Sequence, residues 1–264
     1  MQRDFTSLAS IDICRINHDF QGMRAVNDTT LRINAGEFVS VVGPSGCGKT
    51  TLLNLIAGLI ELQDGSIVIA DGKPKAGRHD VAYMLARDCL FPWRTALENV
   101  TLAGEFRGVL RAQRTERARE LLVKVGLRGF ENHYPKALSH GMRQRVALAR
   151  TFSMDSLVML MDEPFGALDA QTKLQLEDVL LDLWTAEKRT VMFITHDLNE
   201  AVTLSDRVIV MSGRPGTILA DIPIPLQRPR SVRALQKDPR YHEIYAEVWS
   251  RLEEGLTQSN QVHA

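Results

Sequence analysis

The chain has 264 residues, enough for one large or two modest domains, and its 32 lysines and arginines are balanced by 32 aspartates and glutamates. With no excess of positive charge it lacks the electrostatic footprint of a nucleic-acid-binding protein, so we expect no nucleic-acid partner. No apolar run approaches the roughly 18 residues of a membrane-spanning helix, and no apolar signal segment opens the chain. The three scattered cysteines form neither a disulfide framework nor a metal pattern. Together these features predict a cytosolic globular protein.

The first part of the chain contains short β-rich runs, turns and one helix. Residues 11–16 and 29–34 alternate well enough to be strands, and the glycine-bounded residues 65–72 predict a strand in a hairpin or an edge ribbon. Residues 38–43 form a β-rich run that ends in glycine, and residues 51–59 behind it have helical spacing.

Farther along, helices alternate with continuous apolar strands. A strand predicted at residues 80–85 precedes a mainly helical stretch at 97–153. The apolar runs 157–162 and 190–196 are typical of parallel strands covered on both faces, and the amphipathic helix predicted at 170–189 lies between them. Strands that alternate with helices imply an α/β layer with a parallel sheet, in which the helical stretch is an insertion.

The C-terminal part of the chain is predicted to be extended and then helical. Residues 214–230 are rich in proline, and the final helix carries an apolar stripe made by Tyr241, Tyr245, Val248, Trp249 and Leu252. We therefore expect one domain over residues 11–240, with a helical subdomain inserted at about residues 90–155, and a C-terminal helix and tail over residues 241–264.

The sequence GPSGCGKT at residues 43–50 follows a predicted strand and opens a predicted helix, which is the setting of a phosphate-binding loop. Glycines let the backbone wrap closely around an anion, Lys49 supplies positive charge toward the β- and γ-phosphates, and the Thr50 hydroxyl is suited to bind Mg²⁺. The alternative is an ordinary glycine-rich turn. The predicted nucleotide-binding residues here are Gly43, Pro44, Ser45, Gly46, Cys47, Gly48, Lys49, Thr50 and Thr51.

Two carboxylates, Asp162 and Glu163, stand at the end of the apolar run 157–162. One interpretation is that these two residues only form a turn. Beside a phosphate loop we expect Asp162 to hold Mg²⁺ through water and Glu163 to take a proton from the attacking water.

Among the seven histidines, His196 stands out because it ends the apolar run 190–196 and precedes a predicted helix. Its alternative is a capping role, but with a phosphate loop in the chain we expect it to reach the γ-phosphate. The histidines expected at the surface are His18, His79, His133, His242 and His263.

A second anion-binding helix start is predicted at residues 138–150, LSHGMRQRVALAR. The backbone N–H groups of Ser139, His140 and Gly141 stand at the positive end of that helix, where an anion binds.

Five motifs in this order, GPSGCGKT, LSHGMRQRVALAR, LVMLMDEP, GALD and FITHD, closely resemble the ATP-binding subunits of ABC transporters, from about residue 11 to beyond residue 213. The resemblance implies an α/β fold of ABC type: a P-loop NTPase core with an antiparallel β subdomain and an inserted helical subdomain. It also implies an ATPase that uses ATP and Mg²⁺ and works as a homodimer.

The resemblance assigns further residues. It makes Phe20 the aromatic side chain that stacks on adenine, Asp169 part of the loop that contacts the opposing subunit, and His196 the switch histidine. In the family the signature helix of one subunit closes over the ATP held by the other, so Ser139 and Gly141 are expected to meet the partner's phosphate.

Two departures from the family pattern stand out. His140 and Met142 occupy positions where glycine and glutamine are commonest, and Ala86 occupies the position of a loop glutamine that reaches Mg²⁺ and the lytic water. Either Asp88 substitutes for that glutamine, or hydrolysis is slower and depends on the partner, or the chain is a regulatory subunit that binds ATP and turns it over poorly. We favour a working ATPase because Lys49 and the other catalytic residues are present.

Residues 90–100, LFPWRTALENV, and the C-terminal tail look like the nitrate, sulfonate and taurine importer group. This implies a peripheral subunit on the cytoplasmic face of the inner membrane, bound to an integral permease and served indirectly by an extracytoplasmic solute-binding protein. We expect residues 90–100 to receive a permease helix, although burial within the chain explains Phe91, Pro92 and Trp93 equally well. A competing interpretation, a soluble ABC-type ATPase that acts on DNA or ribosomes, lacks its usual coiled-coil insertion or second ATPase domain here.

Overall fold

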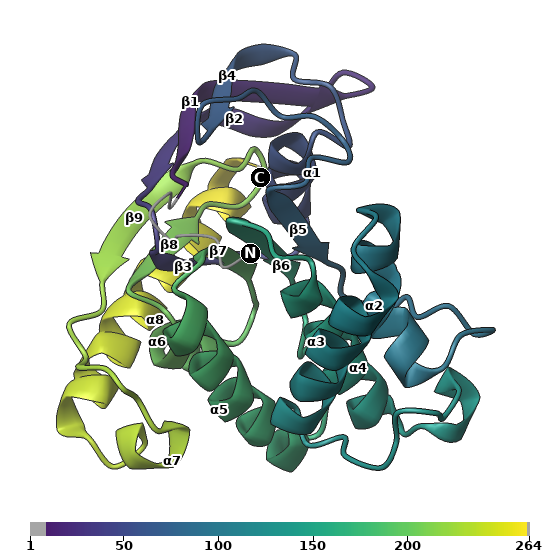
Figure 1. The fold of residues 1–264 in the computed structure, drawn as a ribbon. Coiled ribbons are helices and arrows are strands. Elements are labelled where there is room, and N and C mark those ends of the chain that lie inside the picture. The colour runs from purple at the N-terminus through teal and green to yellow at the C-terminus, as the bar shows by residue number, and fades with distance from the viewer. Residues whose placement is uncertain (1–8, 263–264) are drawn as a thin grey trace.

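The structure is a computed structural model that describes the backbone of residues 9–262 and the side chains of residues 9–256. A six-stranded sheet with the order β5-β6-β7-β3-β8-β9 lies at its centre (Figure 1). Its first five strands are parallel and β9 is antiparallel to β8. Its strands are β3 (Phe38–Val42), β5 (Val81–Met84), β6 (Val158–Asp162), β7 (Thr190–Ile194), β8 (Arg207–Met211) and β9 (Ile218–Pro223).

The middle strands of this sheet are buried on both faces. All five residues of β3, of β6 and of β7 are buried, as the predicted continuous apolar runs require. The parallel order brings the carboxyl ends of β3, β6 and β7 to the same edge of the sheet, and the loops that leave these ends carry the sequence motifs.

A second, antiparallel sheet with the order β2-β1-β4 covers one end of the molecule (Figure 1). It consists of β1 (Ile11–Phe20), β2 (Met23–Ile33) and β4 (Asp64–Ile69). The first two strands are longer than predicted, because register shifts at residues 13–19 interrupt the alternation of apolar and polar residues. The two-residue turn Gln21–Gly22 that joins them therefore lies close to Phe20.

Three helices lie between β5 and β6 in the chain and form the lobe on the right of Figure 1. Their common core includes Val100, Leu121, Leu122 and Phe152, each at most 1% exposed. The helical character predicted for residues 97–153 is thus confirmed. The elements are α2 (Ala96–Phe106), α3 (Arg111–Lys124), the short 3₁₀ helix η1 (Pro135–Ala137) and α4 (His140–Ser153).

Side-chain caps fix where several helices begin. Thr95 and Glu98 form a reciprocal capping box at the start of α2, and Ser139, Asp169 and Asp197 accept hydrogen bonds from backbone N–H groups at the starts of α4, α5 and α6. The remaining helices are α1 (Lys49–Ala57), α5 (Ala170–Glu187), α6 (Leu198–Leu204), α7 (Val232–Leu235) and α8 (Pro239–Val262).

The C-terminal helix α8 packs against α6 and β8. Tyr241, Ile244 and Val248 lie in one apolar cluster with residues of those elements, and the Tyr241 hydroxyl donates to Asn199 Oδ1 at 3.0 Å. The predicted stripe is wrong at Trp249, which is 47% exposed. Trp249 follows the buried Val248 and is turned about 100° away from it around the helix axis.

No helix in the part of the chain that the structure describes is long and apolar enough to cross a membrane. The division into a domain at residues 11–240 and a C-terminal segment stays a prediction.

Candidate functional site

The loop between β3 and α1, residues 43–48, has the backbone shape of an anion cradle. Gly46 and Gly48 adopt positive φ angles of 77° and 100°, which L-residues with side chains rarely adopt. A Cβ atom on Gly48 would lie 2.7 Å from the Ala25 carbonyl oxygen, and one on Gly43 would lie 2.9 Å from the Met211 carbonyl oxygen. Close backbone approach therefore requires glycine at positions 43 and 48, and the positive φ angle favours it at position 46. The N–H groups at the start of α1 are left to face a ligand.

Lys49 lies under this loop and is 7% exposed. Its Nζ atom donates to the carbonyl oxygens of Gly43 at 2.8 Å and of Pro44 at 2.9 Å, and it lies 3.7 Å from Cys47 Sγ. A buried ammonium group that is held by neutral acceptors leaves its charge available to an anion in the loop. Cys47, at 1% exposed, packs as a small side chain beneath the cradle.

Thr50 and Asp162 bring two oxygen ligands together beside the cradle. The Thr50 hydroxyl donates to Asp162 Oδ1 at 3.2 Å, across the gap between α1 and the end of β6. Burial raises the pKa of Asp162 above its ordinary value, while the Thr50 hydrogen bond and the charge of Lys49 oppose that rise. Paired hydroxyl and carboxylate oxygens fit Mg²⁺, which binds proteins through one or two carboxylates together with substrate phosphates.

A metal site built from protein side chains alone is not present in the described residues, because no group of three or more His, Cys, Asp or Glu side chains is placed to hold an ion. A magnesium ion at Thr50 and Asp162 would thus need further ligands from the nucleotide or from water.

Glu163 and His196 form the exposed side of the same site. The Glu163 backbone has a positive φ of 45°, and its N–H group donates to the Ile194 carbonyl oxygen at 2.9 Å, so the chain turns sharply at the end of β6. One Glu163 oxygen lies 3.1 Å from His196 Nδ1, and both side chains are open to solvent. A carboxylate and an imidazole joined in this way are suited to accept a proton and to orient a bound water.

The start of α4 forms a second group with the start of α5. The Ser139 hydroxyl accepts a hydrogen bond from the Met142 N–H at 3.2 Å, and Asp169 accepts one from the Thr172 N–H at 3.0 Å. A Cβ atom on Gly141 would lie 2.8 Å from Thr172 Cγ2, so the two helix starts are in close contact. α4 and α1 lie in different parts of the fold (Figure 1), so Ser139 and Gly141 do not join the phosphate loop of their own chain.

The loop around Ala86 is fastened to α4 by contacts that sequence reasoning missed. Asp88 pairs with Arg143 at 2.9 Å and Arg150 donates to the Asp88 carbonyl oxygen at 2.6 Å, while Gln144 donates to the Ala86 carbonyl oxygen at 3.2 Å. The Asp88 carboxylate is thus already paired with α4, and its substitution for a loop glutamine stays a prediction. The contacts join residues 55 or more positions apart, which no local pattern indicates.

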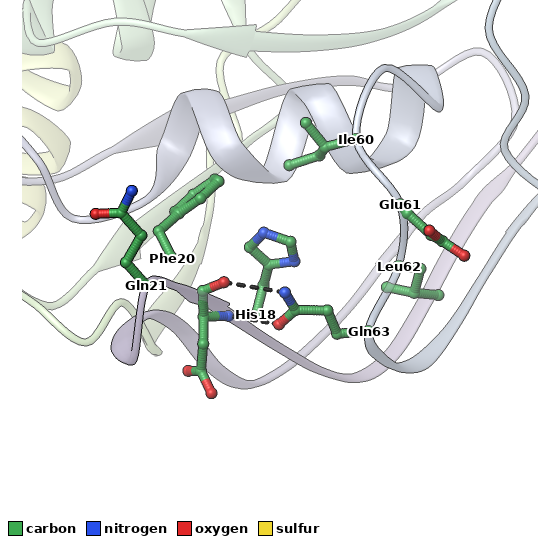
Figure 2. A pocket seen from close by; sticks show the side chains of 8 residues that line it. His18, Phe20, Gln21, Ile60, Glu61, Leu62 and Gln63 are labelled. Atoms are coloured by element: carbon green, nitrogen blue, oxygen red, sulfur yellow. Dashed lines mark hydrogen bonds between the residues drawn. The ribbon is translucent and has the colours of Figure 1, made fainter.

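Phe20 ends β1 beside an open cavity of about 550 Å³ (Figure 2). It is 46% exposed, and its ring packs edge-on against His18 with the centroids 4.6 Å apart. Gln63 fastens the opposite wall, since its Oε1 accepts from the Asp19 N–H at 2.7 Å and its Nε2 donates to the Asp19 carbonyl oxygen at 3.0 Å. The lining consists of His18, Asp19, Phe20, Gln21, Ile60, Glu61, Leu62 and Gln63.

His18 corrects one expectation, because it is only 4% exposed and is not a surface residue. It lies under Phe20 at the wall of the cavity, a position that depends on the contact between β1 and residues 60–63. His263 lies outside the described residues.

Comparison with known proteins agrees with the geometry. The family profile described as ABC transporter matches residues 26–166. The uncharacterised ABC transporter ATP-binding protein MJ0412 of Methanocaldococcus jannaschii is 46% identical over 220 residues, which are 83% of this chain and 82% of that protein. The taurine import ATP-binding protein TauB of Escherichia coli K12 is 39% identical over 246 residues, 92% of this chain and 96% of TauB.

The chain is also similar to a solved structure, the dimeric post-hydrolysis state of the ATP-binding cassette MJ0796 bound to ADP and Pi. The two superpose with a TM-score of 0.71 at 31% sequence identity, over 82% of this chain and 100% of the MJ0796 chain. Together with the phosphate loop and the Glu163–His196 pair, these similarities show that the chain is an ATP-binding ATPase subunit that belongs to the ABC transporter family.

Proposed function

We propose that this ATPase powers a membrane importer for a small anionic solute such as nitrate, a sulfonate or taurine. The observation that carries the proposal is the loop at residues 90–100 together with an apolar groove, described below, on a chain that also carries the ATPase site. Similarity to the taurine import protein of Escherichia coli supports the import direction and the solute class.

In this proposal the phosphate loop and its neighbours bind the nucleotide. Backbone N–H groups of residues 43–51 hold the phosphates, Lys49 neutralises the β- and γ-phosphates, and the exposed face of Phe20 stacks on adenine. Thr50 and Asp162 would hold Mg²⁺, which neutralises phosphate charge when it is bound.

Glu163 and His196 carry the hydrolytic step. Glu163 accepts a proton from the water that attacks the γ-phosphate, and His196, held by Glu163 at 3.1 Å, donates toward the γ-phosphate oxygens. Both side chains lie at the open side of the site, where a water and a second subunit have access.

The second anion site belongs to the same reaction in a homodimer. We infer that Ser139 and Gly141 at the start of α4 close over the ATP held by the other subunit, with Asp169 in the loop that faces that subunit. The dimeric form of the ADP-bound cassette supports this arrangement. Triphosphate held from two sides then links the subunits, and loss of phosphate weakens the link.

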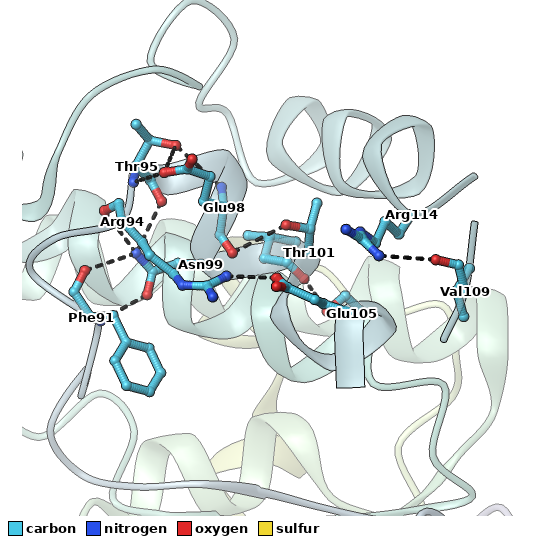
Figure 3. Close-up of polar contacts among 11 residues, drawn as sticks. Phe91, Arg94, Thr95, Glu98, Asn99, Thr101, Glu105, Val109 and Arg114 are labelled. Carbon is cyan, nitrogen blue, oxygen red and sulfur yellow. Dashed lines mark hydrogen bonds and ion pairs between the residues drawn. The ribbon is translucent and has the colours of Figure 1, made fainter. Parts of the chain in front are cut away.

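The surface for a permease lies at residues 90–100. Trp93 is 69% exposed, and the buried Asn99 fixes the loop from inside by bonding the backbone of Phe91, Arg94 and Thr95 at 2.8 to 3.2 Å (Figure 3). A rigid loop with an exposed tryptophan is suited to bind a partner.

An apolar groove is lined in part by Ala103 and Phe106, at the far end of the helix α2 that begins within residues 90–100. It has a volume of about 400 Å³, and its exposed apolar residues include Phe106 at 81%, Leu59 at 55% and Leu85 at 43%. A short cytoplasmic helix of a permease fits a groove of this kind. We therefore place the protein peripherally at the cytoplasmic face of the inner membrane, with a solute-binding protein acting indirectly.

A second candidate function is an ATP-binding regulatory subunit with weak hydrolysis. It is favoured by Ala86, which is exposed where relatives carry glutamine, and by Asp88, which is bound to Arg143.

One experiment separates the two functions. The chain is expressed alone and together with an integral membrane permease of an import system from the same organism, and phosphate release is measured for both preparations. Co-purification and stimulated phosphate release are expected for an importer ATPase. Stable binding to the permease with no phosphate release would favour the regulatory subunit, and absence of binding would contradict the import proposal.

A further inference from the structure

The turn between β8 and β9, residues 212–217, lies against the phosphate loop and carries Arg214. Figure 1 shows this turn beside the start of α1. From the sequence, residues 214–230 are predicted only to be an extended, proline-rich segment.

The turn is fixed from two sides at Gly216. Its N–H group donates to the Ala25 carbonyl oxygen at 3.0 Å, and its carbonyl oxygen accepts from the Asn27 N–H at 2.9 Å, which binds the turn to β2. A Cβ atom on Gly216 would lie 1.9 Å from the Cys47 carbonyl oxygen in the phosphate loop. Only glycine permits this approach, so the turn is a rigid neighbour of the loop.

The turn also has internal bonds that hold its shape. The Ser212 hydroxyl donates to the Pro215 carbonyl oxygen at 3.0 Å and accepts from the Thr217 N–H at 2.9 Å. Arg214 is therefore presented from a defined backbone and not from a loose loop.

The guanidinium group of Arg214 bridges the phosphate loop and the start of β2. Its Nη2 atom donates to the Gly46 carbonyl oxygen at 3.3 Å, and its Nη1 atom lies 3.2 Å from Met23 Sδ. Arg214 is exposed, and it forms no ion pair with a carboxylate in the described part of the chain. One contact is long and the other is to a thioether, a weak acceptor, so most of its five N–H donors remain open to a stronger ligand.

Arg214 lies between the phosphate loop and the β1–β2 turn. A nucleotide whose phosphates lie in residues 43–50 and whose base lies on Phe20 has to cross the space between the phosphate loop and the β1–β2 turn. Arg214 stands at the rim of that space, because Gly46 belongs to the loop and Met23 follows Phe20 by three residues. Guanidinium groups match phosphate oxygens in charge and in geometry.

We propose that Arg214 is a second cationic ligand of the nucleotide, in contact with the polyphosphate at its ribose end. The proposal rests on the proposed nucleotide site at residues 43–51 and Phe20. Lys49 neutralises the phosphates from below the loop, and Arg214 neutralises them from its rim.

The competing explanation is that Arg214 only fastens the phosphate loop to the hairpin. The two roles differ in their dependence on charge and on salt. A contact with phosphate weakens as ionic strength rises, and lysine retains part of it. A guanidinium that only fastens the loop through neutral acceptors has little salt dependence.

The test is a calorimetric titration of the full chain with magnesium ADP, which is not hydrolysed, at low and at physiological ionic strength. The variants are Arg214→Gln and Arg214→Lys, with Arg233→Gln on the exposed face of α7 as a charge-matched control. Arg214→Gln is expected to bind ADP about tenfold more weakly than the wild type at low ionic strength, to depend less on salt, and to melt at the wild-type temperature. The ADP affinity of Arg214→Lys is expected to lie between those of Arg214→Gln and the wild type.

Unchanged ADP affinity in Arg214→Gln would overturn the proposal. A loss of affinity with unchanged salt dependence and no recovery in Arg214→Lys would also overturn it and leave only the fastening role. Failure of the proposed nucleotide site itself gives a different result, because the wild type and Arg233→Gln would then bind no ADP.

Discussion

Lys49 holds the phosphate loop in shape, because its ammonium group donates to the carbonyl oxygens of Gly43 and Pro44. Removal of the side chain takes away both the positive charge and two bonds of the cradle. Lys49→Ala is expected to weaken ATP binding by about 10- to 100-fold, the range of hydrogen bonds to charged groups. Equilibrium titration with ATP measures this, with the exposed Lys124→Ala as the control; equal affinity in the two variants would remove Lys49 from the site.

Glu177 lies in α5, is 2% exposed, and has its pKa raised to about 8 by burial and by the nearby charges of Glu200 and Asp197. The folded protein therefore keeps a proton on Glu177 at neutral pH that the unfolded chain has lost. The free energy of unfolding should fall as pH rises from about 4.5 to about 8, by at most about 1.4 kcal/mol per pH unit from this group.

Glu177→Gln removes that contribution, so its free energy of unfolding should rise relative to the wild type as pH increases through the same window. Urea unfolding at about pH 5 and about pH 8 checks this, and Glu116→Gln, exposed on α3, serves as the control. A difference between Glu177→Gln and the wild type that stays constant with pH would contradict the expectation.

At the scale of elements, the loop after β5 and helix α4 act as one unit. Asp88, Arg143 and Gln144 join them, so a shift of the loop next to the proposed permease surface is expected to reach the start of α4, where Ser139 and Gly141 lie. The pairing of Asp88 with Arg143 favours a positioning role for Asp88.

Ala86→Gln tests whether the missing glutamine limits turnover. Ala86 is exposed, so the longer side chain has space without repacking of the core. The ATPase rate, or its stimulation by the permease, is expected to change, and phosphate release with and without the permease measures both. If the rate and the stimulation both equal the wild-type values, position 86 has no role in turnover here.

The motif-bearing loops could be predicted from the sequence because each depends on local geometry. A tight loop is indicated by the glycines at positions 43, 46 and 48, two of which have positive φ angles. A helix start is indicated by Ser139, whose side chain caps α4. The burial of His18, the exposure of Trp249 and the Asp88–Arg143 pair could not be predicted, since each depends on residues distant in the chain. The predicted lengths of β1 and β2 are too short, because bulges break the two-residue period that indicates a strand.

At the scale of the whole molecule, one subunit holds only half of each proposed ATP site. The phosphate loop, Glu163 and His196 lie in one group, and Ser139, Gly141 and Asp169 lie in another. Glu163→Gln is expected to keep ATP binding, to reduce turnover by about 10²–10⁴-fold, and to accumulate a closed dimer with ATP. Light scattering with and without ATP, alongside phosphate release, measures this, with Glu116→Gln as the control. A variant that hydrolyses ATP at the wild-type rate would show that Glu163 is not the base.

The contact of Tyr241 with Asn199 has a practical consequence for anyone who handles this protein. The helix that contains Asn199, α6, begins two residues after His196, and it packs against α8. Loss of the Tyr241, Ile244 and Val248 side chains is therefore expected to loosen the packing of the helix that follows His196. Truncations designed to remove the tail should keep Leu252, which packs against this apolar cluster, and the buried Gly255, which lies against Leu219 and Ser212.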